Sequence, residues 1–333
     1  MASRSELPGT AVRIGVIGVG SLGFHHARLL KALPETELVG ICDTDIERSR
    51  SVAEELGVGF SANLEDLLES VDAVTVAVPT QAHFDVATQA LAHDCDLLIE
   101  KPVTSTVSEA DELIRRAEER SRIIQVGHIE RFNCAVRACE PYLDRPLFVE
   151  SHRLAPFVPR GTDVPVVLDL MIHDIDLILS LVGEDVVDVR AVGVSVLSPS
   201  VDIANARLEF ERGAVANITA SRVSIQRQRK IRFFQPSGYI SLDLGSGTGE
   251  YYRRTRGSRD DATQLSDLVE HISLRGDGEE PLRLELEAFV KAVRRESPVA
   301  VSAEEGRQAL AVALEIVERI ERHREHVFDS YPA

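Results

Sequence analysis

The chain has 333 residues, of which 44% are hydrophobic, so it can bury a sizeable core, and its length favours two globular domains over one. Its formal net charge of −17 at pH 7 argues against nucleic acid as a partner and against a DNA-binding regulator. The N-terminal residues lack the apolar core of a signal peptide, and the four cysteines show no metal-binding or disulfide spacing. We therefore expect a cytoplasmic protein that does not enter a membrane.

Short apolar runs alternate with amphipathic stretches over the first 127 residues, and this βαβα order predicts a parallel sheet covered by helices on both faces. The predicted strands are Val12–Ile17, Leu38–Cys42, Ala73–Val78, Leu97–Glu100 and Ile123–Val126. The predicted helices cover residues 22–33, 45–56, 64–69, 81–93 and 108–120. Residues 1–127 are thus expected to form an α/β domain.

The pattern changes after residue 127. It predicts a helix over residues 131–143, a strand at Leu147–Leu154 and a helix over Val166–Val182. Alternating runs between Val186 and Leu244 predict a largely antiparallel open sheet, whereas residues 245–281 are expected to form an irregular loop. Two amphipathic helices, 282–296 and 303–324, close the chain. Residues 128–333 are therefore expected to form an α+β domain, and its closing helices are candidates to pack back on the first domain.

The first predicted strand runs directly into a glycine-rich turn, Gly18-Val19-Gly20-Ser21-Leu22-Gly23, and a helix follows. In this setting the first glycine allows a tight turn, the second lets the backbone approach a pyrophosphate, and the third packs the helix on the strand. Asp43 ends the second strand, where its carboxylate can accept from a ribose 2′-hydroxyl and repel a 2′-phosphate; an ordinary turn or cap is the alternative. We therefore predict a Rossmann domain that binds NAD rather than NADP through Gly18, Gly20, Ser21, Leu22, Gly23 and Asp43.

Two further strand ends belong to the carboxyl edge of the same sheet, where ligands bind in open α/β sheets. Pro79 and Thr80 follow one strand and can approach the nicotinamide half of the cofactor, and so can His83, for which a surface position is equally favoured. Glu100-Lys101-Pro102 ends the next strand, and the proline fixes the turn that displays the lysine. A solvated lysine beside a stop signal is the alternative. We assign Pro79, Thr80, His83, Glu100 and Lys101 to the cofactor site.

The helix predicted over Val166–Val182 is apolar nearly all round but carries an unusual set of polar residues. Asp169, His173, Asp176 and Ser180 follow the spacing i, i+4, i+7 and i+11, which places them on one side, and Asp174 points elsewhere. Because buried carboxylates need partners, this row is expected to line a cavity. The alternatives are a satisfied core histidine for His173 and a helix-internal hydrogen bond for Asp169. A metal site on His173, Asp169 and Asp176 ranks below these interpretations.

The segments GVGSLGFHH, VPTQAH, EKP, DLMIHDID and EEGRQALAVALEIV together resemble the Gfo/Idh/MocA family of NAD(P)-dependent oxidoreductases, in the family's order and over essentially the whole chain. The resemblance implies a Rossmann domain followed by an α+β domain whose open sheet often mediates oligomerisation, so a homodimer or homotetramer is expected. It also implies that Lys101, Asp169 and His173 are the catalytic residues.

These roles agree with the chemistry of oxidising a secondary alcohol. Because the imidazole of histidine ordinarily titrates near neutral pH, His173 is suited to remove the hydroxyl proton as general base. Asp169 can orient the resulting imidazolium or hold a substrate hydroxyl, and Lys101 can stabilise the developing alkoxide. Because hydride transfer to NAD needs no metal, no metal site is predicted.

Within the family, the segment from Val126 to Asn133 and the segment Arg153–Phe157 with Arg160 are similar to members that oxidise the 3-hydroxyl of UDP-N-acetylglucosamine. A diphosphate needs cationic donors, which Arg153 and Arg160 could supply, although surface salt bridging explains them equally well. The predicted substrate-binding residues are Lys101, Arg153, Arg160, Asp169 and His173. The alternatives are an inositol or free-sugar dehydrogenase and a sensor that binds NAD without turnover.

Overall fold

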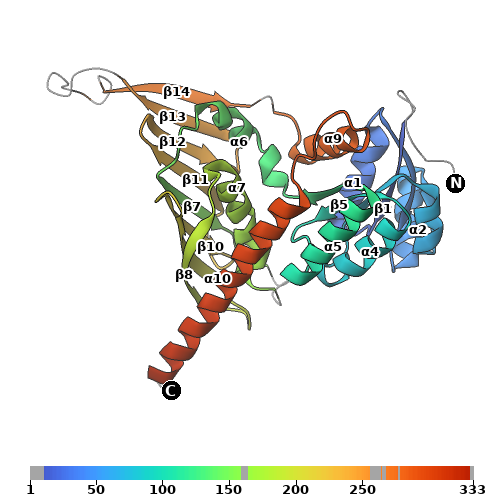
Figure 1. Ribbon diagram of the computed structural model, residues 1–333, viewed down its shortest axis with the longest axis horizontal. Coiled ribbons are helices and arrows are strands. Elements are labelled where there is room, and N and C mark those ends of the chain that lie inside the picture. Colours follow the sequence, from blue (N-terminus) through green and yellow to red (C-terminus); the bar gives the residue numbers. More distant parts are fainter. Residues whose placement is uncertain (1–10, 159–163, 256–263, 265–267, 277, 331–333) are drawn as a thin grey trace. The chain divides into compact units, whose positions relative to one another are not determined.

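The structure, a computed structural model, describes residues 11–158, 164–255, 264, 268–276 and 278–330, with side chains described as far as residue 326. The chain divides into two compact units (Figure 1). The first comprises the residues up to His128 together with Leu282–Arg307, and the second comprises Ile129–Pro281 together with the residues from Gln308 onward. Among the helices described, none is both long and apolar enough to cross a membrane.

The first unit is built on a parallel sheet with the strand order β3-β2-β1-β4-β5-β6. Its strands are β1 (Val12–Ile17), β2 (Thr36–Cys42), β3 (Gly59–Phe60), β4 (Ala73–Val76), β5 (Asp96–Glu100) and β6 (Ile124–Gly127). The helices between them are α1 (Ser21–Ala32), α2 (Ile46–Leu56), α3 (Leu64–Ser70), α4 (His83–Ala92) and α5 (Val107–Arg120). The order reverses between β1 and β4, and ligands bind at the carboxyl ends of strands at such a switch point. The predicted α/β fold of this region is confirmed.

Local sequence signals set the limits of these helices. Asp45 caps α2 by accepting a hydrogen bond from the Arg48 amide, and Gly57 ends the helix with a left-handed φ of 60°. Helix α5 begins with a capping box in which the side chains of Thr106 and Glu109 bond to each other's backbone amides. These caps fix where each helix leaves the edge of the sheet.

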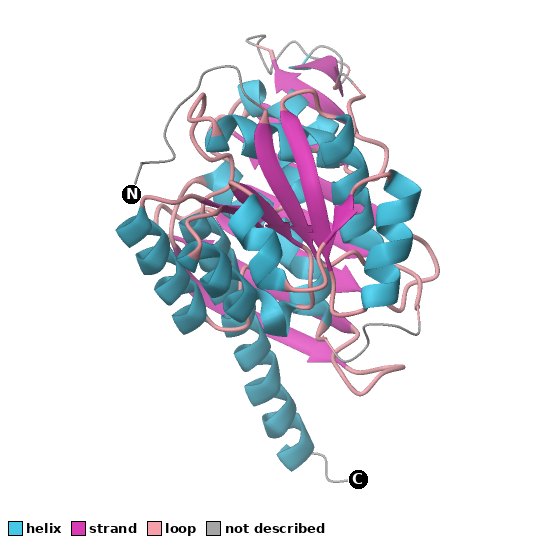
Figure 2. Cartoon of the chain, turned by 90° about the vertical axis from the view of Figure 1, so that its right-hand side faces the viewer, coloured by secondary structure: helices cyan, strands magenta, loops and turns pink. Residues whose placement is uncertain are grey.

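Residues near the C-terminus complete the first unit. Helix α9 (Pro281–Val293) contacts β6, where the Gln125 side-chain amide donates to the Glu285 carbonyl over 3.1 Å. Helix α10 (Ala303–Ser330) is continuous as far as the described chain extends (Figure 2). Near its start the backbone of Gly306 lies against Val126, so closely that a Cβ there would be 2.6 Å from a Val126 methyl. The first unit therefore combines the N-terminal part of the chain with residues 282–307.

The second unit is built on a largely antiparallel sheet with the strand order β14-β13-β12-β11-β7-β10-β9-β8 (Figure 1). Neighbouring strands run antiparallel except β7 and β10, which are parallel. The strands are β7 (Phe148–Leu154), β8 (Val186–Val194), β9 (Ile203–Phe210), β10 (Val215–Ser221), β11 (Gln228–Gln235), β12 (Gly238–Asp243), β13 (Thr248–Arg254) and β14 (Val269–Arg275). The expected α+β class with an antiparallel sheet is confirmed.

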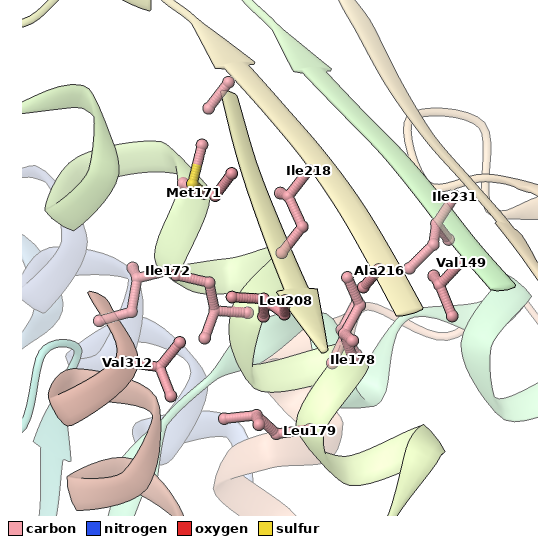
Figure 3. Close-up of a cluster of buried hydrophobic side chains, with 14 of the residues drawn as sticks. Val149, Met171, Ile172, Ile178, Leu179, Leu208, Ala216, Ile218, Ile231 and Val312 are labelled. Carbon is pink, nitrogen blue, oxygen red and sulfur yellow. The ribbon is translucent and has the colours of Figure 1, made fainter. Parts of the chain in front are cut away.

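One face of this sheet is covered by helix α7 (Ile172–Val182) and, within the same unit, by the part of α10 after residue 307. Figure 3 shows Ile172, Ile178 and Leu179 of α7 among the side chains of the strands, with Val312 of α10 beside them. Ile172 and Ile178 are fully buried. This apolar packing fixes the helix whose polar residues were singled out in the sequence.

Three predicted elements need correction. The irregular loop predicted over residues 245–281 contains strands β13 and β14, whose sequences are rich in charge because one face of these strands is uncovered. The helix predicted over residues 131–143 is divided into a 3-10 turn at Ile129–Phe132, helix α6 (Cys134–Cys139) and a 3-10 turn at Glu140–Tyr142. The division occurs because Asn133 is extended and its side chain caps α6 at Ala135.

The third correction concerns the polar helix. It begins as a π-helical stretch at Val167–Met171, and regular α-helix starts only at Ile172. Because π-helix has a longer repeat than α-helix, the row of polar residues expected from α-helical spacing does not extend unbroken from Asp169 to Ser180. Asp169 and His173 are half-buried, Asp176 is buried and Ser180 is exposed.

Candidate active site

In the first unit, the turn between β1 and α1 has the shape expected of a dinucleotide-binding loop. Gly18 has a φ of +84°, and a Cβ there would be 2.7 Å from the Ala77 carbonyl oxygen. A Cβ at Gly23 would be 1.8 Å from the Gly18 oxygen. At Gly20, by contrast, a Cβ would meet no heavy atom of the described chain within 4 Å apart from its neighbours along the chain. The first and third glycines are thus required by packing, whereas the second leaves space for a ligand.

Helix α1 starts at this turn without an internal cap. Its N-cap residue is Gly20, no side chain of the described residues caps it, and its first turn contains no acidic residue. Ser21 and Leu22 are exposed. The helix N-terminus, with its partial positive charge and amide donors, is therefore open to an anionic group such as a pyrophosphate.

Asp43, at the end of β2, is bonded to the same turn. One carboxylate oxygen accepts from the Val19 amide over 2.8 Å, and the other accepts from the Asp45 amide over 2.9 Å. Asp43 therefore makes the ordinary turn bond that was weighed as the alternative, and it also ties β2 to the glycine turn. Each carboxylate oxygen has two lone pairs, so both retain capacity to accept from a ribose hydroxyl.

The residues after β4 form a short link to α4. Pro79 is exposed and Thr80 half-buried, whereas His83 is 1% exposed. The His83 Nδ1 lies 2.9 Å from the Pro102 carbonyl oxygen and its Nε2 lies 2.9 Å from the Val78 carbonyl oxygen. Burial lowers the pKa of the His83 ring, although both carbonyl groups favour its protonated form. The surface position considered for His83 is thus wrong, since the ring joins the two strand ends of the predicted cofactor site.

Glu100 and Lys101 lie at the end of β5, in the same unit. Glu100 is 8% exposed, and its carboxylate is 3.1 Å from Nε2 of the fully buried His26 on α1. Gly127 makes room for it, because a Cβ there would be 2.9 Å from the Glu100 Cδ. Lys101, the next residue, is half-buried. The buried carboxylate thus fixes the backbone from which the lysine extends.

In the second unit, the predicted proton-handling residues occupy the junction between the π-helical stretch and α7. Asp169 lies within the π-helical stretch and His173 in the first turn of α7. The approach to this junction is anchored, because the Val166 amide donates to the Val201 carbonyl over 3.0 Å and the Arg222 side chain donates to the Val164 carbonyl. π-helical turns within helices occur frequently at functional sites.

The residue after His173 belongs to a buried ion-pair network. Asp174 is 1% exposed and receives two hydrogen bonds from the Arg153 guanidinium, at 3.0 and 2.8 Å. Arg153 is 3% exposed and also donates to Glu130 over 2.8 Å. Burial disfavours the charge on Arg153, but the two carboxylates outweigh it and raise the pKa of the guanidinium. Of the two interpretations of Arg153, this burial favours salt bridging over an open diphosphate donor.

A second arginine holds the other side of α7. Arg131 donates to both carboxylate oxygens of Asp176 at 2.7 Å, and a third hydrogen bond of 2.6 Å reaches the Ser180 hydroxyl. Asp176 is 1% exposed. Asp176 and Ser180 therefore hold helix α7 in place through Arg131, whereas the sequence predicted that they line a cavity. Arg131 was missed as the partner of Asp176 because it lies 45 positions away, and Glu130 was missed as a partner of Arg153, which lies 23 positions away.

The structure collects the predicted residues into two sets, one in each unit. The cofactor residues and Lys101 belong to the first unit, and Asp169, His173 and Arg153 to the second, while Arg160 lies outside the described residues. In the described part of the chain, the group with metal-binding geometry is Glu65, Glu69 and His93, which does not include the histidine and carboxylates of the polar helix.

Two family models match the chain. The model for the oxidoreductase family with an NAD-binding Rossmann fold matches residues 12–128, and the model for the GFO/IDH/MocA C-terminal domain matches residues 125–241.

Known proteins of similar sequence include two dehydrogenases. The chain is 39% identical over 306 residues to UDP-N-acetylglucosamine 3-dehydrogenase of Acidithiobacillus ferrooxidans, which covers 92% of this chain and 96% of that protein. It is 28% identical to the myo-inositol 2-dehydrogenase of Thermotoga maritima, over 94% and 97% of the two chains.

Two solved structures resemble this chain in fold. The structure of the Acidithiobacillus ferrooxidans enzyme superposes with a TM-score of 0.87 at 37% identity, over 94% of this chain and 98% of that chain. The scyllo-inositol dehydrogenase of Lactobacillus casei, solved with NAD(H) and scyllo-inositol, has a TM-score of 0.77 at 19% identity over 94% and 98% of the chains, a likeness of fold alone.

Proposed function

The chain belongs to the GFO/IDH/MocA family of NAD-binding oxidoreductases, and we propose that it is an NAD-dependent dehydrogenase that oxidises the 3-hydroxyl of a UDP-N-acetylhexosamine such as UDP-N-acetylglucosamine. The observation that carries this proposal is the 39% identity to UDP-N-acetylglucosamine 3-dehydrogenase over 92% of the chain. The glycine turn, Lys101, Asp169 and His173 are all present to support it.

In this proposal His173 removes the proton of the substrate hydroxyl as the carbon–oxygen bond becomes a carbonyl. Asp169 stabilises the imidazolium that forms or holds a neighbouring hydroxyl of the sugar. The Lys101 ammonium donates to the reacting oxygen and stabilises its developing negative charge. When bound, NAD+ supplies the acceptor for the hydride that leaves the same carbon. The products are a 3-keto sugar, NADH and a proton.

The residues of the first unit fit the cofactor. Space at Gly20 admits a pyrophosphate against the start of α1, and the Asp43 carboxylate can accept from the adenosine ribose. We propose NAD over NADP because Asp43 would repel a 2′-phosphate. Arg48 lies 3.6 Å from Asp43 and 3.1 Å from Asp45, so its charge is already engaged by two carboxylates. Pro79, Thr80, His83 and Glu100 belong to the nicotinamide side in this proposal.

We also propose a cytoplasmic homodimer or homotetramer. Supporting assembly, the face of the sheet away from α7 carries a row of neighbouring rings, with centroids 5.0 to 5.6 Å from one to the next. The rings are Phe148, Phe234, Tyr239, Tyr252 and His271. Light scattering coupled to gel filtration gives the mass, and a monomer at micromolar concentration would contradict this part of the proposal.

The decisive experiment follows NADH absorbance when the purified protein is given NAD+ and a panel of sugars. Turnover is expected with UDP-N-acetylglucosamine, and with NADP+ it should be much weaker. Turnover with inositol or a free sugar instead would favour the function of the Thermotoga maritima relative. NAD+ binding without turnover on any of these sugars would contradict the dehydrogenase proposal and favour a sensor.

A further inference from the structure

One short segment of the second unit concentrates positive charge in a strongly acidic chain. Between Arg222 and Arg232 the sequence contains five cationic residues and no acidic one, although the whole chain has a net charge of −17. The cationic residues are Arg222, Arg227, Arg229, Lys230 and Arg232. The segment leads from the end of β10 into β11.

Two of these arginines are already engaged elsewhere. Arg222 is 6% exposed, donates to the Val164 carbonyl and lies 3.8 Å from the buried Asp202. Arg232 donates to Glu150 over 3.0 Å. Neither guanidinium is therefore available to a ligand without first breaking a bond within the protein.

Arg229 differs from both. Its side chain is 43% exposed, and within the described residues its ion-pair partner is Glu130, at a distance of 3.8 Å. In the antiparallel pairing of β11 with β7, Arg229 lies directly opposite Arg153. Directly opposite residues of a sheet project from the same face, which here is the face packed on α7. Arg153 is therefore the inner and Arg229 the outer member of an arginine pair.

The charges that the structure describes around this pair do not balance. Among the described residues, Arg153 and Arg229 share the carboxylates of Asp174 and Glu130, and Arg227, two residues before Arg229, adds a third positive charge near Arg229. Burial, followed by repulsion from Arg153, lowers the pKa of Arg229, with a smaller contribution from Arg227. A bound anion would compensate this excess, and a diphosphate presents oxygens that match an arginine fork.

The pair is also tied to the reacting residues. Arg153 is bonded to Asp174, which follows His173 in α7. The position of β7, and with it of Arg229 on β11, is therefore fixed relative to the helix that carries the proposed general base. A nucleotide sugar carries its diphosphate on the anomeric carbon, so a diphosphate held beside this helix keeps the sugar ring close to His173.

We propose that Arg229, with Arg227 beside it, binds the diphosphate of the nucleotide sugar, and that Arg153 positions Glu130 and α7 beneath it without touching the substrate. This proposal rests on the proposed function, because it assumes a nucleotide-sugar substrate. It transfers the role predicted for Arg153 to a neighbouring residue that a ligand can reach. It also gives a basis for preferring UDP-sugars over free sugars.

The test measures the affinity for UDP, which carries the diphosphate but cannot react. Titration calorimetry compares the wild-type protein with Arg229→Gln, for which we expect a loss of UDP affinity of about 10- to 100-fold. Arg232→Gln is a matched control, since this arginine lies on the same strand with the same 43% exposure but is paired with Glu150. The control should bind UDP like the wild type, and both variants should keep wild-type affinity for NAD+.

Kinetics separate this inference from the function it rests on. With UDP-N-acetylglucosamine, Arg229→Gln should raise KM with little change in kcat. The lost contact would stabilise the bound substrate and the transition state equally. Unchanged UDP affinity in Arg229→Gln, an equal loss in Arg232→Gln, or no UDP binding by the wild type would overturn the inference. UDP binding that depends on Arg229 without oxidation of any UDP-sugar would leave this site standing and remove the proposed reaction.

Discussion

The turn Gly18–Gly23 in the first unit and helix α7 in the second prepare a ligand site by different physical means. The turn contributes backbone amides and empty space, and at Gly18 and Gly23 it cannot tolerate a Cβ atom. Helix α7 contributes side chains, and its carboxylates are held by arginines from distant parts of the chain. The first region should therefore be sensitive to added volume, and the second to a missing charge.

The largest effect is expected from adding one carbon to the turn. Gly23→Ala forces a Cβ to within 1.8 Å of the Gly18 oxygen, so the turn must move and NAD+ binding should be lost together with stability of the first unit. Gly20→Ala meets no described atom within 4 Å and should fold normally while still losing NAD+ affinity. Thermal unfolding and NAD+ titration of both variants test the distinction. Equal melting temperatures for the two variants would contradict it.

The helix region should instead respond to charge removal. Arg153→Ala leaves Asp174 and Glu130 buried without their principal partner, and we expect a loss of about 3–5 kcal/mol of unfolding free energy in urea. Arg190→Ala, which removes an exposed arginine paired with Asp188, is the control and should have little effect.

A double variant sharpens the same comparison. Replacing Arg153 by Met and Asp174 by Leu removes the pair together, so much of the stability lost in Arg153→Ala should return. Glu130 would retain Arg229 as a partner. A double variant as unstable as Arg153→Ala would mean that the packing of these side chains, and not their charge pairing, stabilises the folded protein.

The smallest effect is a pH dependence in the first unit. Because the pKa of His83 is lowered in the folded protein, the unfolded chain binds more protons below about pH 6.5. The unfolding free energy should therefore fall as the pH drops through this range and be insensitive to His83 above it. His83→Gln should show less of this fall than the wild type in urea titrations at pH 5 and 7.5. An equal fall in both proteins would contradict the assignment.

How far the sequence predicts the molecule also differs between these regions. Strand β1 was predicted to the residue, and the glycine turn and Asp43 were identified because their signals are local and periodic. Strands β13 and β14 were missed because their charged residues, among them the adjacent pair Arg253 and Arg254, interrupt the regular alternation of apolar and polar residues. The alternation that predicted the strands between Val186 and Leu244 is weak over residues 245–281, so these strands resembled a polar loop.

The partners of the polar helix could not be predicted for a related reason. Asp174 and Asp176 were identified as buried carboxylates that need partners, but the arginines that satisfy them come from β7 and from a turn after β6. Spacing along the chain carries no information on such pairs. The π-helical stretch at Val167–Met171 likewise depends on tertiary packing, and it shifts Asp169 relative to the predicted row.

The central claim is that the first unit binds the cofactor while His173 of the second unit handles the proton. Its most direct test uses one preparation of His173→Ala, with NAD+ affinity measured by calorimetry and turnover of UDP-N-acetylglucosamine by NADH absorbance. We predict that kcat falls by about 10²- to 10⁴-fold while NAD+ affinity stays within about twofold of the wild type. Retained turnover, or a loss of NAD+ affinity as large as the loss of kcat, would contradict the claim.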